Sequence, residues 1–185
     1  MGSGSPLSRK QLLILLGIAT VVFDLVMTYL DRKMMDAGGP SIIDFEFAGS
    51  KQQAAKIVAE WGAGGRDYAR WSLWLDYGFM LSYGSFFALA GIATRDFARQ
   101  SGMRRLAAVG VVAPIAAVAA AGFDATENIF LLLTLGGHGG SFGPPIATVC
   151  ASLKFALIAF AIAYVLWGLA ARLFRVRRAG QASGA

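Results

Sequence analysis

Residues 105–135 read RLAAVGVVAPIAAVAAAGFDATENIFLLLTL and decide the fold. An apolar run of 31 residues exceeds the roughly 20 helical residues that a bilayer needs, so it predicts a transmembrane helix that is tilted or kinked at Pro114. Asp124, Glu127 and Asn128 interrupt the run. A charged side chain in hydrocarbon costs at least roughly 2.5 to 3.5 kcal/mol, so these residues should face protein or water.

Three further apolar runs, at about 11–30, 71–94 and 146–171, are each long enough to cross a bilayer. The 185-residue chain is 56% hydrophobic and only 15% charged, with a mean hydropathy of +0.57. Such a composition is typical of an integral membrane protein. We therefore expect an all-α, polytopic protein with four transmembrane helices in one domain, residues 11–171, between tails at 1–10 and 172–185.

Basic residues are distributed unevenly between the two predicted sides of the membrane. Ten Lys and Arg lie in the two tails and the short connection near residue 100, whereas the 31–70 loop has six that six acids balance. The positive-inside rule then places both termini in the cytoplasm and the chain in the cytoplasmic membrane. The basic patches predict contacts with anionic lipid headgroups, without any need for nucleic acid, at Arg104, Arg105, Arg175, Arg177 and Arg178.

The 31–70 loop is too patterned to be a simple connector and is expected to form a lid. Ser50 and Gln53 have the spacing of a capping box, and apolar residues follow at helical spacing, which predicts a short amphipathic helix outside the membrane. Before it, apolar residues 43, 45 and 47 alternate with Asp44 and Glu46, which predicts a short extended segment with these two acids in solvent. The glycine-rich stretches 38–39 and 62–65 bracket the unit as turns or hinges.

Each predicted span contributes polar side chains at a similar depth. The spans contain five charged side chains, those of Asp24, Asp76, Asp124, Glu127 and Lys154. Counting about 1.5 Å per residue from the outer end of each span places all five roughly 9 to 16 Å below the outer boundary of the membrane. Because polar stripes avoid lipid, we expect them to meet in one ligand-binding chamber. Its predicted members are Asp24, Asp76, Tyr83, Asp124, Glu127, Asn128 and Lys154.

The charge of this predicted chamber limits the cofactors and ligands that it could hold. Four carboxylates beside one ammonium must share protons, open to water or coordinate a cation. A divalent cation is one candidate, with Asp76, Asp124 and Glu127 as ligands. The single Cys excludes an intramolecular disulfide and a cysteine zinc site, and the single His excludes bis-histidine haem ligation. The sequence contains no phosphate-binding loop motif, so no nucleotide is predicted.

Three functions fit this pattern. The first is an outward-opening, acid-lined pocket that binds a cation or a small polar ligand and transports it as a homo-oligomer. The second is an intramembrane enzyme acting on a lipid or isoprenoid, with Asp124 or Glu127 as acid or base and Lys154 stabilising negative charge. The third is an accessory subunit whose buried polar residues only join helices.

Overall fold

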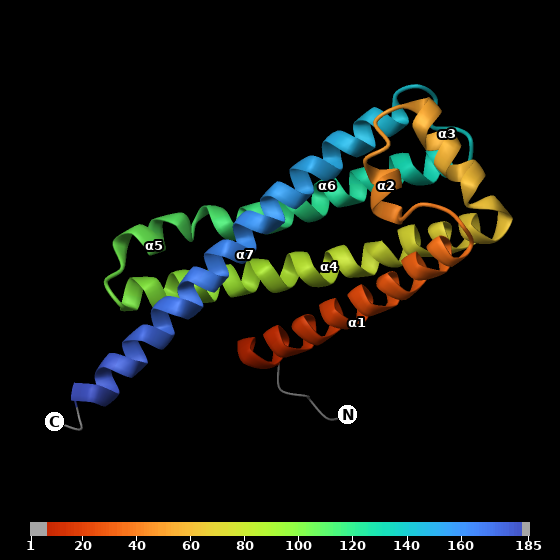
Figure 1. Ribbon diagram of the computed structural model, residues 1–185. Coiled ribbons are helices and arrows are strands. Elements are labelled where there is room, and N and C mark those ends of the chain that lie inside the picture. Colours follow the sequence, from red (N-terminus) through yellow and green to blue (C-terminus); the bar gives the residue numbers. More distant parts are fainter. Residues whose placement is uncertain (1–6, 183–185) are drawn as a thin grey trace, which may run out of the picture.

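The computed structural model describes residues 7–182, with side chains as far as Arg175, and this part of the chain is helical and contains no strand (Figure 1). Four stretches are long and apolar enough to cross a membrane, so the predicted all-α, four-span fold is confirmed. The helices are α1 (Arg9–Asp36), α2 (Ile42–Glu46), α3 (Lys51–Glu60), α4 (Gly62–Gln100), α5 (Arg104–Val109), α6 (Val112–Leu135) and α7 (Gly143–Ala182).

The four long stretches pack in the order α1, α4, α6, α7. α6 lies against both α4 and α7, α7 also contacts α4, and α1 packs mainly against α4 at the edge of the bundle. Figure 1 shows α2, α3 and the α6–α7 loop together at one end, which we call the cap end. The N-terminus of α1, α5 and the C-terminal part of α7 lie toward the opposite end, which we call the tail end.

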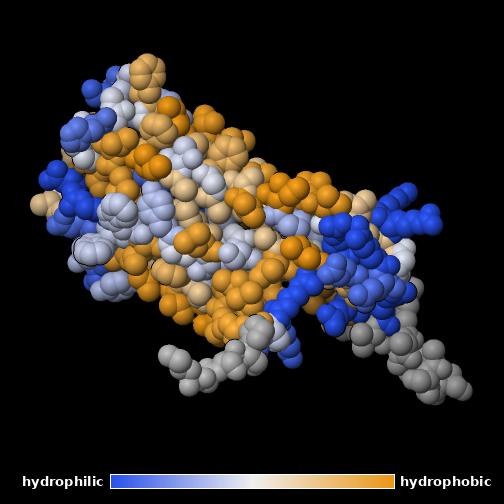
Figure 2. Space-filling model, turned by 180° about the vertical axis from the view of Figure 1, so that it is seen from behind, coloured by the Kyte–Doolittle hydropathy of each residue, from blue (hydrophilic) through white to orange (hydrophobic). Residues whose placement is uncertain are grey.

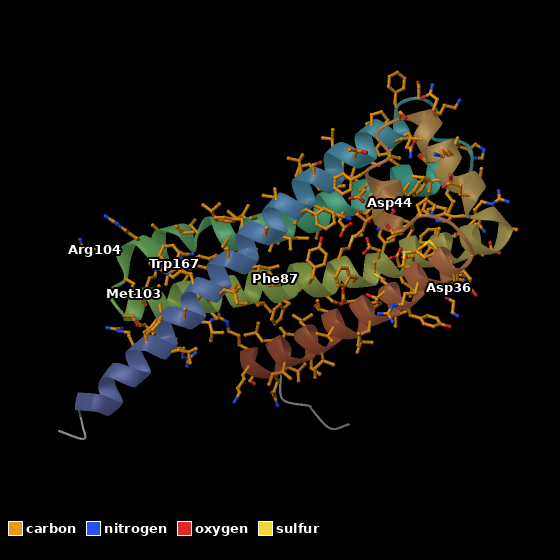
Figure 3. All side chains as sticks on the ribbon, viewed as in Figure 1. Asp36, Asp44, Phe87, Met103, Arg104 and Trp167 are labelled. Carbon is orange, nitrogen blue, oxygen red and sulfur yellow. The ribbon has the colours of Figure 1, made fainter. Side chains whose placement is uncertain are left out.

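The surface matches a protein embedded in a membrane. Figure 2 shows a broad hydrophobic zone between two ends at which hydrophilic residues gather. Figure 3 places Met103, Arg104 and Trp167 at the tail end, and Arg104, Arg105 and Arg175 are exposed there. The side chains of Arg177 and Arg178 lie outside the described residues. The chain is therefore a multi-pass protein by the length and composition of its helices.

The third span is interrupted rather than continuous. α5 ends at Val109 and α6 begins at Val112, so the break precedes the kink expected at Pro114 by a few residues. Proline has no amide hydrogen, so Pro114 leaves the carbonyl of Gly110, four residues earlier, without its helical partner. Gly110 packs so closely on Arg95 and Tyr164 that an added methyl group would collide with both. The break thus lies where the helix lacks a hydrogen bond and packs closely against its neighbours.

The 31–70 segment, predicted to be a lid, forms much of the cap end, and we call it the cap. Its residues 42–46 form helix α2 rather than the predicted extended segment. Ser41 caps this helix, because its hydroxyl accepts from the amide of Asp44 while the Asp44 carboxylate accepts from the amide of Ser41. Ile42 and Phe45, three residues apart, share the buried face. Asp44 of α2 is exposed, as expected.

Helix α3 packs by one face against the rest of the cap end. Ser50 caps it by accepting from the amide of Gln53, and Ala54, Ile57 and Trp61 are buried. The Trp61 indole donates to the Pro40 carbonyl at 2.6 Å. The expected hinge at 62–65 is a single turn at Gly62, where φ is +59°, and α4 starts there.

Candidate functional site

The centre of the candidate site is the ammonium group of Lys154 on α7. Its Nζ lies 2.9 Å from Asp124 Oδ1 and 3.0 Å from Glu127 Oε2, both on α6. It also lies 3.4 Å from Glu46 Oε2 on α2. One cation therefore contacts three carboxylates from two separate elements.

Two further interactions extend this centre toward α4. Asn128 donates from Nδ2 to Asp76 Oδ2 at 2.6 Å, and the Tyr83 hydroxyl donates to Asp124 Oδ2 at 2.8 Å. Asp124, Glu127 and Asn128 are spaced i, i+3 and i+4, so they project from the same side of α6. We call the following set the acid cluster: Glu46, Asp76, Asp124, Glu127 and Lys154, with Tyr83 and Asn128 hydrogen-bonded to it.

The acid cluster is shielded from solvent and lipid. Glu127 is 0% exposed, Asp124 2% and Lys154 5%, and the other members are also buried. With all four acids ionised the cluster would carry a net charge of −3, because Lys154 is its only cation. In the described residues, Oε2 of Glu46 and Oε2 of Glu127 are buried and lie 3.4 and 3.0 Å from the Lys154 ammonium without the geometry of a hydrogen bond. Burial at low dielectric disfavours such an excess of negative charge, so the cluster favours bound protons.

Glu46 was predicted to be a solvated loop acid, and its place in the acid cluster is the main correction to the predicted site. The Thr148 hydroxyl donates to the Glu46 carbonyl at 2.9 Å and accepts from the amide of Gly49 at 3.1 Å, which fixes the end of α2 on α7. Burial raises the pKa of the Glu46 carboxyl, and the nearby Lys154 ammonium opposes this effect only in part. The acid cluster thus contains an acid from outside the four spans, which the pattern of the spans alone does not predict.

A signal for Glu46 is present in the sequence. Ser41 and Asp44 have the spacing of a capping box, which predicts a helix beginning at residue 42. In a helix, Ile42 and Glu46 are four residues apart and share a face, so burial of the apolar residue also turns the acid inward. The alternation of apolar and acidic residues at 43–47 concealed this pattern.

Asp24 was predicted to join the same chamber, but the structure does not bring it there. It is exposed on α1, which packs mainly against α4 at the edge of the bundle. The side of α1 that meets α4 contains Phe23, whose ring packs against Gly78. Counting residues fixed the height of Asp24 along the helix but not the direction in which it points.

The predicted metal ligands Asp76, Asp124 and Glu127 do lie within the acid cluster. However, no group of three His, Cys, Asp or Glu side chains within residues 7–182 is arranged to hold a metal ion. The Lys154 ammonium lies between Glu46, Asp124 and Glu127, where such an ion would bind. The acid cluster therefore has a built-in cation.

The expected outward opening is closed by α2 in this structure. Glu46 lies on Lys154, and Phe47 stacks on Phe155 of α7 with ring centroids 5.9 Å apart. Five of the hollows along the described surface have volumes of about 290 to 510 Å³, and none of these five is lined by a residue of the acid cluster. What the structure shows is thus a buried, covered group of charged residues in a membrane-spanning bundle. Comparison of the chain with protein-family models, with curated proteins and with solved structures gave no match.

Proposed function

We propose that this chain is a proton-binding membrane protein whose acid cluster exchanges protons with the solution at the cap end. The observation that carries the proposal is the position of Lys154, with three carboxylates within 3.4 Å of its Nζ and a fourth acid, Asp76, behind Asn128. Four acids around one ammonium can approach neutrality by binding up to three protons. The cation of the original prediction is then a proton.

The position of the ammonium favours protons over a metal ion or an organic cation. A second cation entering between Asp124, Glu127 and Glu46 would lie within contact distance of the ammonium, and like charges at low dielectric repel strongly. A proton binds directly to one carboxylate oxygen and needs no such space.

The surroundings of the cluster favour exchange at the cap end. On the tail side, Met80, Ala120 and Leu157 from three helices pack together as an apolar layer. On the cap side, the cover is the short helix α2, which is linked to its neighbours through turns at Gly38 and Gly49, both with positive φ. Displacement of α2 would carry the Glu46 carboxyl from the cluster toward water. With the orientation given by the charge distribution, that water is outside the cell.

Infrared spectroscopy of the purified protein tests proton binding directly. We expect protonated carboxyl groups at neutral pH that disappear on alkaline titration, with fewer of them in Glu127→Gln. Asp67→Asn is the matched control, because Asp67 is an exposed acid on the same chain that pairs only with Arg70. Absence of any protonated carboxyl at neutral pH, or an equal loss in the control, would disprove the proposal.

A flux assay then separates proton binding from proton transport. The protein is reconstituted in liposomes that contain a pH-sensitive dye, and a pH difference is imposed across the membrane. A flux that depends on Glu127 would show that the cluster also opens toward the tail end. Binding without flux would show that proton exchange is confined to the cap side.

A further inference from the structure

A hollow that shares no residue with the acid cluster lies at the cap end. Its volume is about 510 Å³, which is within the range of small-ligand sites. One wall is the outer face of α3 with the start of α4, and the other is the glycine-rich α6–α7 loop. The residues that line it are Lys51, Ala55, Val58, Ala59, Gly62, Arg66, Thr134, Leu135, Gly136, Gly137, Gly139 and Gly140.

The charged residues that line this hollow have the same sign. Lys51 and Arg66 line it, and no carboxylate does. This excess of positive charge is local to the hollow, because the 31–70 segment as a whole contains as many acids as bases. The hollow is therefore a local positive region on a cap that is close to neutral overall.

Within the described residues these two cations have no ionic partner, as is also true of Arg32 in the same segment, whereas the other three bases of the segment are paired. Lys33, Lys56 and Arg70 each lie within 4.0 Å of a carboxylate, those of Asp36, Glu60 and Asp67. Within the described residues, neither Lys51 nor Arg66 has a carboxylate that close. Arg66 uses its Nε to donate to the Gly62 carbonyl, which orients the guanidinium and leaves its terminal nitrogens for an outside acceptor.

The opposite wall allows a ligand to approach the backbone. Gly136, Gly137, Gly139 and Gly140 present no side chains, and Gly137 and Gly140 have φ values of +81° and +59°. A bulky group can therefore lie against peptide groups on one side and cations on the other. Phosphate suits this combination, because guanidinium donates to it through two parallel bonds and ammonium binds it as a point charge.

We infer that the hollow between α3 and the α6–α7 loop binds a phosphate group, carried by a lipid headgroup or by a free phosphate ester. The inference does not rest on proton binding by the acid cluster, since the two sites share no residue. Occupancy would join α3 to the α6–α7 loop and hold the cap in place.

The test uses the full chain and two probes. Calorimetry with inorganic pyrophosphate, on protein in detergent, measures binding of a free phosphate compound. Hydrogen exchange of the 51–60 and 134–142 segments, in nanodiscs of phosphatidylcholine with or without phosphatidylglycerol, measures binding of a lipid phosphate. The test variant is Lys51→Gln/Arg66→Gln. The control is Lys56→Gln/Arg70→Gln, which removes the same charge from the same segment but does not line the hollow.

Each outcome decides the inference. Losing both cations should weaken binding by up to about 30-fold, since each exposed ionic contact with phosphate contributes at most about fivefold. Pyrophosphate binding lost only in the test variant would support a free phosphate ester, and phosphatidylglycerol-dependent protection lost only there would support a lipid. Neither probe acting on the wild type, or equal losses in both variants, would overturn the inference. Equal melting temperatures of the two variants, measured first, establish that folding is intact.

Discussion

Replacing Lys154 with methionine should destabilise the protein, and more so at high pH than at low pH. The substitution keeps the volume of the side chain but removes the one cation within 3.4 Å of Glu46, Asp124 and Glu127. Removing one partner of a buried ion pair usually costs about 3 to 5 kcal/mol, because the remaining charge is left without compensation. For a chain of this size, that corresponds to a fall in melting temperature of roughly 6 to 20 °C.

The pH dependence separates this explanation from simple loss of packing. Acids that lack a cation become neutral by binding protons, so acidification should restore much of the lost stability. Unfolding in detergent can be followed through the fluorescence of the four tryptophans across a pH series. Lys56→Met is the control, because Lys56 is exposed and lies 3.9 Å from Glu60, and such surface pairs are worth at most about 1 kcal/mol. A loss that is independent of pH, or one that grows on acidification, would refute the electrostatic reasoning.

Three further predictions test the cap, the helix packing and the orientation. Burial raises the pKa of the Glu46 carboxyl, so protonated Glu46 favours the docked state of α2 at a pH below the ordinary carboxyl pKa, and this advantage is lost as the pH rises through the raised pKa. Hydrogen exchange of residues 42–60 should therefore increase with pH in the wild type. It should increase much less in Glu46→Gln. Gly65→Ala would put a methyl group 2.8 Å from the Trp61 Cβ and should lower the free energy of unfolding by about 1 to 3 kcal/mol. Gly64→Ala is the control, because a methyl group there has no neighbour within 4 Å, and it should be neutral or slightly stabilising. Equal effects of the two substitutions on thermal unfolding would contradict the described packing. With Cys150 buried, a cysteine at exposed Ser141 should react with an impermeant maleimide in intact cells, and one at exposed Gln100 only after permeabilisation; the reverse pattern would invert the orientation.

Much of the fold could be predicted because it depends on length and hydropathy, which are local properties of the sequence. The four spans fall where the apolar runs are, and the residues that interrupt them on α6 and α7 do meet. The spacing of Asp124, Glu127 and Asn128 fixed a single helical face, and one complementary cation on α7 was enough to predict that the two acids meet Lys154.

The remaining features depend on information that hydropathy does not carry. A polar residue on an edge helix such as α1 has no second helix to define its direction. The depth of Asp24 along the helix could therefore be predicted, but not the side of the helix on which it lies. The break at Gly110 depends on how closely Tyr164 and Arg95 approach from other helices. Glu46 lies outside every span, and its burial follows from the tertiary docking of α2 on Thr148 rather than from its neighbours in sequence.

Under the proposed function, the position of Glu46 makes cap docking and proton binding two parts of one equilibrium. Its backbone is held by Thr148 and its carboxyl by Lys154, so α2 can leave only if the ammonium loses one of its three carboxylates. If protonation of the cluster favours the docked cap, docking must favour protonation by the same free energy, because linkage is reciprocal. An anion that joined α3 to the α6–α7 loop would hold the same cap in place. It would therefore raise proton affinity at the acid cluster without touching any of its residues, and its own affinity would rise on acidification to the same extent.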